Sequence, residues 1–257
     1  MRNAPSSNCA RLAATPLALG GTPVAVWLAA LDNKSLQPLD TTGCRRLVVV
    51  APHPDDETLG LGATIAQLAA SGVEVQVVSV SDGGAAQPGA GLSDQTKVEF
   101  TRRRELAEAT SILGTMPPVS LGLPDGRLAE HEDRLNDLLV AILQGAAPQT
   151  WCAATWRGDG HPDHEAVGRA AAAACRRTGT VLLEYPLWMW HWAAPADREV
   201  PWERARQVGV SDWALRRKCS AAQRFRSQFE SSAGGPPPVL PPSVLQRLLA
   251  VSEVVFR

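Results

Sequence analysis

The segment from Arg46 to Gly83 reads RLVVVAPHPDDETLGLGATIAQLAASGVEVQVVSVSDG, and it decides the fold class. Residues 47–51 form a continuous apolar run, mostly valine, which is typical of a strand buried on both faces. Residues 57–70 are rich in Leu and Ala, and the Ser-Gly pair that follows them is a common end of a helix. A second apolar run at residues 73–80 predicts another strand. This strand–helix–strand unit predicts two parallel strands joined by a right-handed crossover.

The same alternation continues along the chain and predicts an α/β fold. The further helices and strands are expected at residues 97–113 (helix), 118–121 (strand), 131–143 (helix, ended by Gly145), 150–155 (strand), 165–176 (helix) and 181–184 (strand). Repeated units of this kind predict a Rossmann-like three-layer sandwich, in which a mostly parallel sheet carries helices on both faces. Ligands of such sheets bind at the carboxyl ends of the strands.

The two ends of the chain are patterned differently. Residues 1–44 show little beyond a helix start at Thr22-Pro23, so we expect an N-terminal helical extension packed on the main domain. Residues 45–257 then form one domain whose C-terminal part is rich in aromatic residues. A helix is expected over residues 212–229, and the proline-rich residues 234–238 and 241–242 are expected to be irregular.

The bulk composition excludes several classes of protein. The 257 residues include 25 basic and 26 acidic side chains, and this balance argues against a nucleic-acid partner or a polybasic membrane anchor. Five scattered cysteines without a C-x-x-C pair favour free thiols in a reducing compartment. No apolar run reaches the roughly 18 residues of a membrane span, and no clean signal peptide is present. We therefore expect a cytoplasmic protein; its oligomeric state stays open, and a homo-oligomer is compatible with the sequence.

The turn His53-Pro54-Asp55-Asp56 joins the first strand to its helix and carries metal-binding chemistry. A hydrolytic zinc ion needs three His, Asp or Glu ligands, an open position for water, and a nearby base that is not a ligand. His53 and Asp56 are three residues apart and can face the same side, while Asp55 points elsewhere and stays free to act on the water. The alternative is that Asp55 or Asp56 only caps the helix and His53 is an incidental neighbour.

The segment His161-Pro162-Asp163-His164 follows the strand at 150–155 and repeats the same spacing. Only one of its two histidines need bind a metal, and the other can then donate a hydrogen bond or a proton to a substrate. Two solvated loop histidines are the alternative, but three of the five histidines in the chain fall in two strand-end segments. The two segments together predict a hydrolytic site with one zinc ion per chain, although such ligand sets accept other divalent ions.

These segments resemble the PIG-L/LmbE-type zinc-dependent N-acetylglucosaminyl deacetylase family. The resemblance lies in VVVAPHPDDETLGLG and GDGHPDHEAVGRA, with weaker similarity in TRRRELAEATSILG, LGLPDGRL and KCSAAQRFRSQF, and it covers about residues 45–230. It implies a role for eight residues: zinc ligands at His53, Asp56 and His164; a general base at Asp55; an oxyanion-stabilising group and proton donor at His161; an orienting carboxylate at Asp163; and sugar contacts at Arg102 and Asp125.

One of these assignments has competing residues, and one residue of some relatives has no counterpart in this chain. Arg103 and Arg104 compete with Arg102, and all three arginines could belong to a solvated helix face. Relatives of the mycothiol pathway carry a tyrosine just before Gly-His-Pro-Asp-His, where this chain has Asp159. The only tyrosine is Tyr185, far along the chain.

The resemblance implies an enzyme that deacetylates an N-acetylglucosamine-type small molecule and releases acetate and a free amine. One alternative is the same amidase chemistry on a thiol conjugate or an acylated natural product. Another is a catalytically silent metal- or carbohydrate-binding module, against which the intact set of Asp55, Asp56, His161 and His164 argues. The Trp-rich segment 185–192, with His191, is expected either to line the substrate mouth or to form an aromatic core patch. The glycine-rich residues 83–91 are expected to be a loop at the rim of the site.

Overall fold

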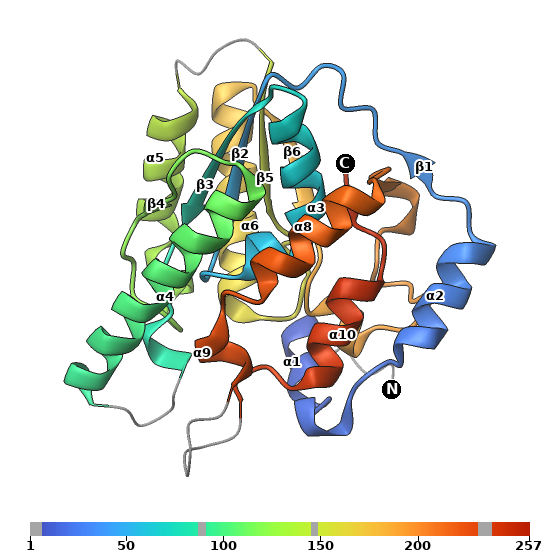
Figure 1. Ribbon diagram of the computed structural model, residues 1–257, viewed down its shortest axis with the longest axis horizontal. Helices are drawn as coiled ribbons and strands as arrows, with labels where there is room; N and C mark the ends of the chain where they lie inside the picture. Colours follow the sequence, from blue (N-terminus) through green and yellow to red (C-terminus); the bar gives the residue numbers. More distant parts are fainter. Residues whose placement is uncertain (1–6, 87–90, 145–148, 231–237) are drawn as a thin grey trace, which may run out of the picture.

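A computed structural model describes residues 7–86, 91–144, 149–230 and 238–257. Eight strands form one sheet in the order β1-β7-β8-β6-β5-β2-β3-β4 (Figure 1). The strands are β1 (Gln37–Pro38), β2 (Arg46–Ala51), β3 (Glu74–Ser79), β4 (Val119–Ser120), β5 (Thr150–Thr155), β6 (Val181–Tyr185), β7 (Ala205–Gln207) and β8 (Val254–Phe256). From β4 to β6 all neighbouring strands are parallel, and β2 lies between β3 and β5.

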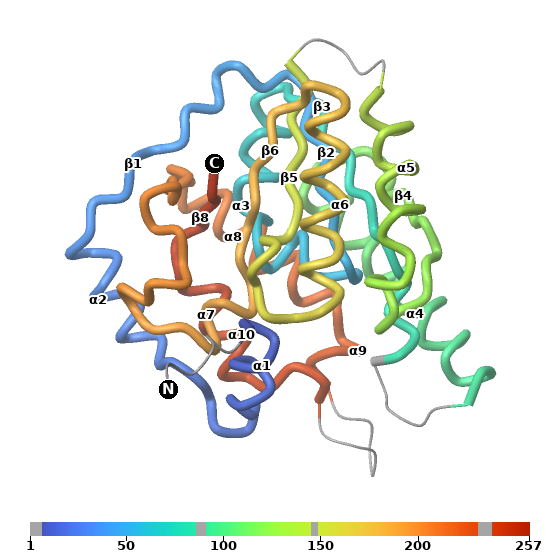
Figure 2. Tube along the Cα trace, turned by 180° about the vertical axis from the view of Figure 1, so that it is seen from behind, coloured from blue at the N-terminus to red at the C-terminus, as the bar shows by residue number. Residues whose placement is uncertain are grey.

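Helices cover both faces of this sheet, which confirms the predicted three-layer sandwich. The α-helices are α1 (Asn8–Ala13), α2 (Val24–Asn33), α3 (Asp56–Ala70), α4 (Leu92–Leu113), α5 (Glu132–Leu143), α6 (Pro162–Thr178), α7 (Met189–Trp192), α8 (Asp212–Ala222), α9 (Arg226–Phe229) and α10 (Pro242–Ala250). Figures 1 and 2 show α3, α4 and α8 on one face and α5 and α6 on the other. Alternate residues of β2 serve the two cores, since Leu47 and Val49 pack toward the first face and Val48 and Val50 toward the second.

The C-terminal part of the chain differs from its sequence-based prediction. The helix expected over 212–229 is broken, because α8 ends at Ala222 and α9 begins only at Arg226. Pro242 is not in a loop but opens α10, where a proline at the first helical position loses no hydrogen bond. Strand β8 was not predicted; it pairs antiparallel with β6 and β7 and so extends the sheet.

Some predictions fall wholly or partly outside the described residues. They concern residues 87–90 of the glycine-rich loop, the helix end at Gly145, and residues 234–237 of the proline-rich stretch. Among the described residues, none of the helices combines the length and hydropathy that crossing a bilayer requires.

Helix α3, which carries part of the candidate site, is kinked at Leu61, whose φ of −133° and ψ of 16° are not helical. The backbone N–H groups of Ala63 and Thr64, just beyond the kink, donate to the carboxylate of Glu253 at 2.9 and 2.7 Å. The same carboxylate lies 2.9 Å from Lys218 Nζ, and both charged side chains are buried. Glu253 therefore acts as a cap inside the helix and joins α3 to α8.

We expect Glu253→Ala to lower the free energy of unfolding by about 3–5 kcal/mol, because it leaves the Lys218 ammonium buried without its partner. Chemical denaturation monitored by circular dichroism measures the change. Glu108→Ala, at an exposed glutamate paired loosely with Arg104 at 3.7 Å, is the control and should change stability by no more than about 0.5 kcal/mol. Equal stabilities of the two variants would contradict the role of Glu253.

The N-terminal helices pack on the Trp-rich segment. Trp27 of α2 donates from Nε1 to the carbonyl of Trp190 at 2.8 Å, and the two rings meet edge to face. His191 is buried, with its Nε2 2.9 Å from the carbonyl oxygen of Thr15 and its Nδ1 3.2 Å from Arg247 Nη1. Of the two alternatives for this segment, His191 and Trp190 thus belong to an aromatic core patch.

Candidate metal centre

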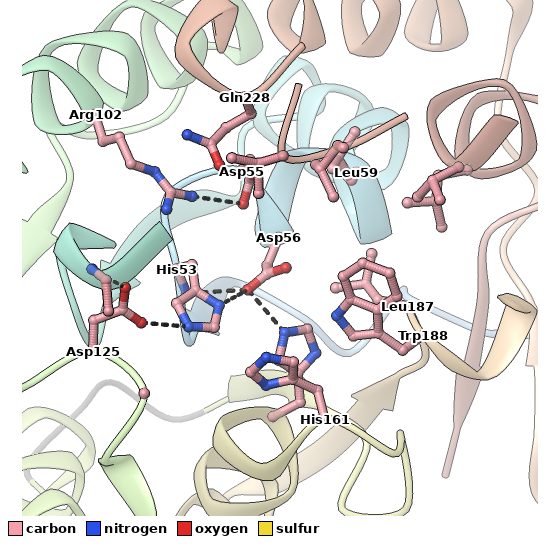
Figure 3. A pocket seen from close by; sticks show the side chains of 17 residues that line it. His53, Asp55, Asp56, Leu59, Arg102, Asp125, His161, Leu187, Trp188 and Gln228 are labelled. Carbon is pink, nitrogen blue, oxygen red and sulfur yellow. Dashed lines mark hydrogen bonds and ion pairs between the residues drawn. The ribbon is translucent and has the colours of Figure 1, made fainter. Parts of the chain in front are cut away.

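The two His-Pro-Asp segments meet at the carboxyl ends of β2 and β5, which are neighbours in the sheet (Figure 3). His53 lies in the turn after β2, and Asp56 is the first residue of α3. His164 lies in the first turn of α6, the helix that follows β5. Parallel pairing of the two strands therefore brings together residues that are more than 100 positions apart in sequence.

His53, Asp56 and His164 present three ligand atoms to one point. Asp56 Oδ2 lies 3.1 Å from His53 Nδ1 and 3.3 Å from His164 Nε2, and the three donor atoms lie within 4.8 Å of one another. His164 Nε2 is buried and has no hydrogen-bond partner among the described residues. Two imidazoles and one carboxylate are a ligand set that a catalytic divalent metal takes. The residues present therefore fit a metal ion.

The charges around this point also favour a cation. Burial alone would raise the pKa of Asp56, but His164 and His53 hold it well below its usual range. Burial alone would lower the pKa of His164, but the carboxylates of Asp56 and Asp159 raise it to about 9. Burial alone would also lower the pKa of His53, but the carboxylates of Asp125, Asp163 and Asp56 raise it well above its usual value. Positive charge is thus stabilised here, whether it is a proton or a metal ion.

Further carboxylates hold the outer ring nitrogens of the two histidines. His164 Nδ1 lies 2.8 Å from Asp159 Oδ2. His53 Nε2 lies 2.9 Å from Asp125 Oδ1 and 3.4 Å from Asp163 Oδ2. Carboxylates placed behind metal-binding histidines fix the ring orientation and tautomer. Asp163 is itself held by the backbone N–H groups of Gly126 and Leu128, at 2.8 and 3.0 Å.

Asp159 has a larger part than its sequence context indicated. Besides contacting His164, its fully buried carboxylate accepts the backbone N–H groups of Leu187, Trp188 and Met189 at 2.8–3.0 Å. Sequence reasoning noted Asp159 only as a departure from relatives with tyrosine. The hydroxyl of Tyr185 donates to the carbonyl of Val50 at 3.0 Å, so it is held in the core and is not a substitute for that tyrosine.

Asp55 occupies a conformation that few residues other than glycine adopt, with φ of 126° and ψ of −31°. It stands at the N-terminus of α3 but makes no side-chain capping hydrogen bond, so the capping alternative does not describe it. Its carboxylate lines the pocket, with Oδ1 3.4 Å from Arg102 Nη2 (Figure 3). Burial raises the pKa of Asp55 to about 8, and the Arg102 guanidinium acts in the opposite direction.

His161 is the N-cap of α6, and its Nδ1 accepts the backbone N–H of Asp163 at 3.2 Å. Burial, together with positive charge on His164 and His53, lowers the pKa of His161 to about 3. The ring is therefore neutral near pH 7, and because Nδ1 accepts a hydrogen bond, the proton resides on Nε2. His161 lines the pocket and can donate from that nitrogen. It is thus not a solvated loop histidine.

Of the three consecutive arginines on α4, only Arg102 is buried at the pocket. Its Nη1 and Nη2 donate to the carbonyls of Gly83 and Pro54 at 3.2 and 2.8 Å. Arg103 instead pairs with Asp82 at 2.8 Å, and Arg104 is exposed. Among the described residues, Arg102 Nε is buried without a hydrogen-bond partner.

The pocket above the metal donors has a volume of about 210 Å³. It brings together seven of the eight residues singled out in the sequence, and the eighth, Asp163, lies behind His53. Ala85 of the glycine-rich loop and Leu187 and Trp188 of the Trp-rich segment also line the pocket, so these residues follow the expected rim and the substrate-mouth alternative. Sequence reasoning missed the rest of the wall, which is mostly apolar and is formed by Leu59, Gly126, Gln228, Val239, Leu240, Val244 and Leu248. No periodic pattern near the two His-Pro-Asp segments could have indicated the wall residues from Gln228 to Leu248, which lie far along the chain.

Comparison with known proteins identifies relatives of the chain. A probable N-acetyl-alpha-D-glucosaminyl L-malate deacetylase 2 of Bacillus cereus is 32% identical over 139 residues, covering 52% of this chain and 62% of the relative. A 1D-myo-inositol 2-acetamido-2-deoxy-alpha-D-glucopyranoside deacetylase of Rhodococcus opacus is 30% identical over 190 residues, covering 63% of this chain and 60% of the relative. The chain thus spans about 60% of the length of these curated relatives.

A solved structure supports the same relationship. A conserved protein of Thermus thermophilus superposes with a TM-score of 0.53 at 31% identity, covering 71% of this chain and 79% of that chain. The family model described as PIG-L, GlcNAc-PI de-N-acetylase, matches residues 48–175, which contain both His-Pro-Asp segments. The chain therefore belongs to the PIG-L family.

Proposed function

We propose that this chain is a zinc-dependent N-deacetylase that hydrolyses the acetamide of an N-acetylglucosamine-type substrate and releases acetate and a free amine. One zinc ion per chain is held by His53, Asp56 and His164. The observation that carries the proposal is the geometry of these three donors, with the carboxylate of Asp55, which is not one of them, beside them in the same pocket. The named activities of the two curated relatives, both deacetylases of glucosamine derivatives, support the same reaction class.

A zinc ion held by His53, Asp56 and His164 would supply Lewis-acid polarisation of the amide carbonyl and would lower the pKa of a water molecule. Asp55 takes the proton from the attacking water. Burial raises the pKa of the Asp55 carboxyl to about 8, whereas the Arg102 guanidinium favours its ionised form. A metal ion bound at the neighbouring donors would act in the same direction as Arg102. A base whose pKa is near the working pH is the most effective one.

His161 stabilises the transition state from the opposite segment. Its neutral ring donates from Nε2 to the developing oxyanion, in a pocket where a preorganised donor needs no reorientation. The proton that Asp55 takes from the water is the one delivered to the departing amine, while His161 keeps its Nε2 proton and only donates a hydrogen bond. Asp163 and Asp159 orient His53 and His164 and act on the reaction only through these ligands.

Arg102 and Asp125 form the polar side of the pocket, where we place the sugar. Arg102 Nε is a buried donor that a sugar hydroxyl would satisfy. Asp125 already contacts His53 through Oδ1 and accepts the backbone N–H of Ala85 at 2.8 Å through Oδ2. It can therefore bind a hydroxyl group and support a metal ligand together.

Acetate release from a panel of N-acetylglucosamine and its malate and inositol glycosides tests the proposal. We expect acetate from at least one substrate, loss of that activity after thorough chelation, and recovery on adding one equivalent of zinc. Full activity after metal removal, or no acetate from any N-acetylated sugar with zinc bound, would contradict the proposed function.

A further inference from the structure

The pocket has a polar side and an apolar side, with the metal donors between them. Figure 3 shows Arg102 and Asp125 on one side of Asp56, and Leu59, Leu187 and Trp188 on the other. Leu240, Val244 and Leu248 line the same pocket from the C-terminal part of the chain. An amide bound at the metal carries one substituent on its nitrogen and another on its carbonyl carbon, so the two sides of the pocket receive different parts of one substrate.

The apolar wall is built by several elements that are packed against one another. Leu59 lies one turn after Asp56 on α3, and it shares a small adjoining pocket with Leu248. Val244 and Leu248 are four residues apart on α10, so they project from one face of that helix. Helix α10 packs against α3 and α7. Leu59, Leu187, Leu240, Val244 and Leu248 are all buried, so they form a preformed wall.

No described residue of this wall carries a charge. The titratable side chains that line the pocket are the metal donors and their neighbours Asp55, His161, Arg102 and Asp125. A second sugar, a carboxylate or an inositol placed against the wall would lose hydrogen bonds to water without replacement. An alkyl chain would gain free energy there from the removal of apolar surface from water.

We propose that this wall is an acyl-binding subsite, and that the preferred substrate is an N-acyl amino sugar whose acyl chain is longer than acetyl. This inference rests on the proposed function, since it places the amide carbonyl at the metal and the sugar against Arg102 and Asp125. The C-terminal wall residues lie beyond residues 48–175 that match the family model, so this part of the pocket is supplied by a different segment from the metal site.

The chemistry remains hydrolysis of one amide bond. The oxygen of water bonds to the acyl carbon, the C–N bond breaks, and the nitrogen leaves as the amine with a proton that came from the water. The products are a short-chain fatty acid and glucosamine, with no oxidant, reductant or second substrate.

A chain-length series with the purified, zinc-loaded protein tests the proposal. The substrates are N-acetyl-, N-butanoyl- and N-hexanoyl-glucosamine, together with the hexyl glycoside of N-acetylglucosamine, and free amine is measured. We expect kcat/KM to rise with acyl length by about 4-fold for each methylene that the wall buries. The hexyl glycoside should gain no comparable advantage over N-acetylglucosamine.

Each outcome of the series has a distinct meaning. A best rate with acetyl, or a gain confined to the hexyl glycoside, overturns the acyl subsite but leaves the deacetylase proposal intact. Absence of cleavage for every amide overturns both. The result does not depend on any variant, so a folding defect cannot obscure it.

A matched pair of variants then tests whether helix α10 causes the preference for longer acyl chains. Val244→Trp fills the wall and should lower the hexanoyl-to-acetyl ratio of kcat/KM at least 10-fold. Val26→Trp makes the same exchange at an exposed valine of α2 that does not line the pocket, and it should leave the ratio unchanged. A well-folded Val244→Trp protein with the wild-type ratio would exclude α10 from the subsite.

Discussion

Asp55→Asn is expected to keep the metal ion and lower turnover by about 10²–10⁴-fold, the usual contribution of a positioned general base. The amide has the size and shape of the carboxylate, and asparagine tolerates unusual backbone conformations better than most residues, so the φ of 126° should persist. The donors of the metal site are untouched, because Asp55 is not one of them. Metal analysis should therefore still find one zinc ion per chain, while acetate release falls.

The control for this variant is Asp137→Asn, at an exposed aspartate paired with Arg177 on the distant α5–α6 surface. It should behave like the wild type in both assays. Turnover of Asp55→Asn within tenfold of the wild type would remove Asp55 from the role of base. Loss of the metal ion from that variant would instead assign Asp55 to the ligands.

His164→Asn is expected to lose the metal ion and, with it, about a thousandfold in turnover. Polarisation by a metal ion is worth several kcal/mol, and each ~1.4 kcal/mol is a factor of ten in rate. Asparagine places an amide N–H near the position of the ring Nδ1, so the contact with Asp159 can be kept while the ligand atom Nε2 is removed. The variant therefore separates loss of the ligand from loss of the fold.

Metal content by elemental analysis, thermal unfolding and acetate release should be measured on the same sample. His131→Asn, at the histidine that directly precedes α5 and does not line the pocket, controls for the exchange itself. A His164→Asn protein that keeps one tightly bound zinc ion and full turnover would show that the metal is bound elsewhere.

The central part of the fold could be predicted because its signals are local. The valine run of β2, the glycine that ends α3 and the Pro162 that opens α6 each act within a few residues. Once β2 and β5 are recognised as parallel strands, the meeting of His53 with His164 follows from the rule that parallel strands end at the same edge. For this reason the two His-Pro-Asp segments could be placed together before their geometry was known, whereas the roles of the individual residues came from the family resemblance.

The parts of the fold and of the site that were not predicted depend on contacts between distant segments. Such contacts leave no local pattern in the sequence. Strand β8 has only three residues, and its pairing with β6 and β7 becomes evident only in the folded sheet. Pro242 favours a loop when read alone, yet it begins the helix that closes the pocket. The hydrogen bonds of Asp159 to the 187–189 backbone likewise depend on a loop conformation that no spacing rule anticipates.

Asp159 contacts both the candidate metal site and the segment that forms part of the apolar wall of the pocket. One carboxylate holds a ring nitrogen of His164 and the backbone of the segment that carries Leu187 and Trp188. If acyl binding at this segment changes the affinity of the His164 site for a metal ion, thermodynamic linkage requires that the metal ion change the affinity for the acyl group by the same factor. With the metal site and the acyl subsite as proposed, we therefore expect metal affinity and substrate selectivity to be coupled through Asp159.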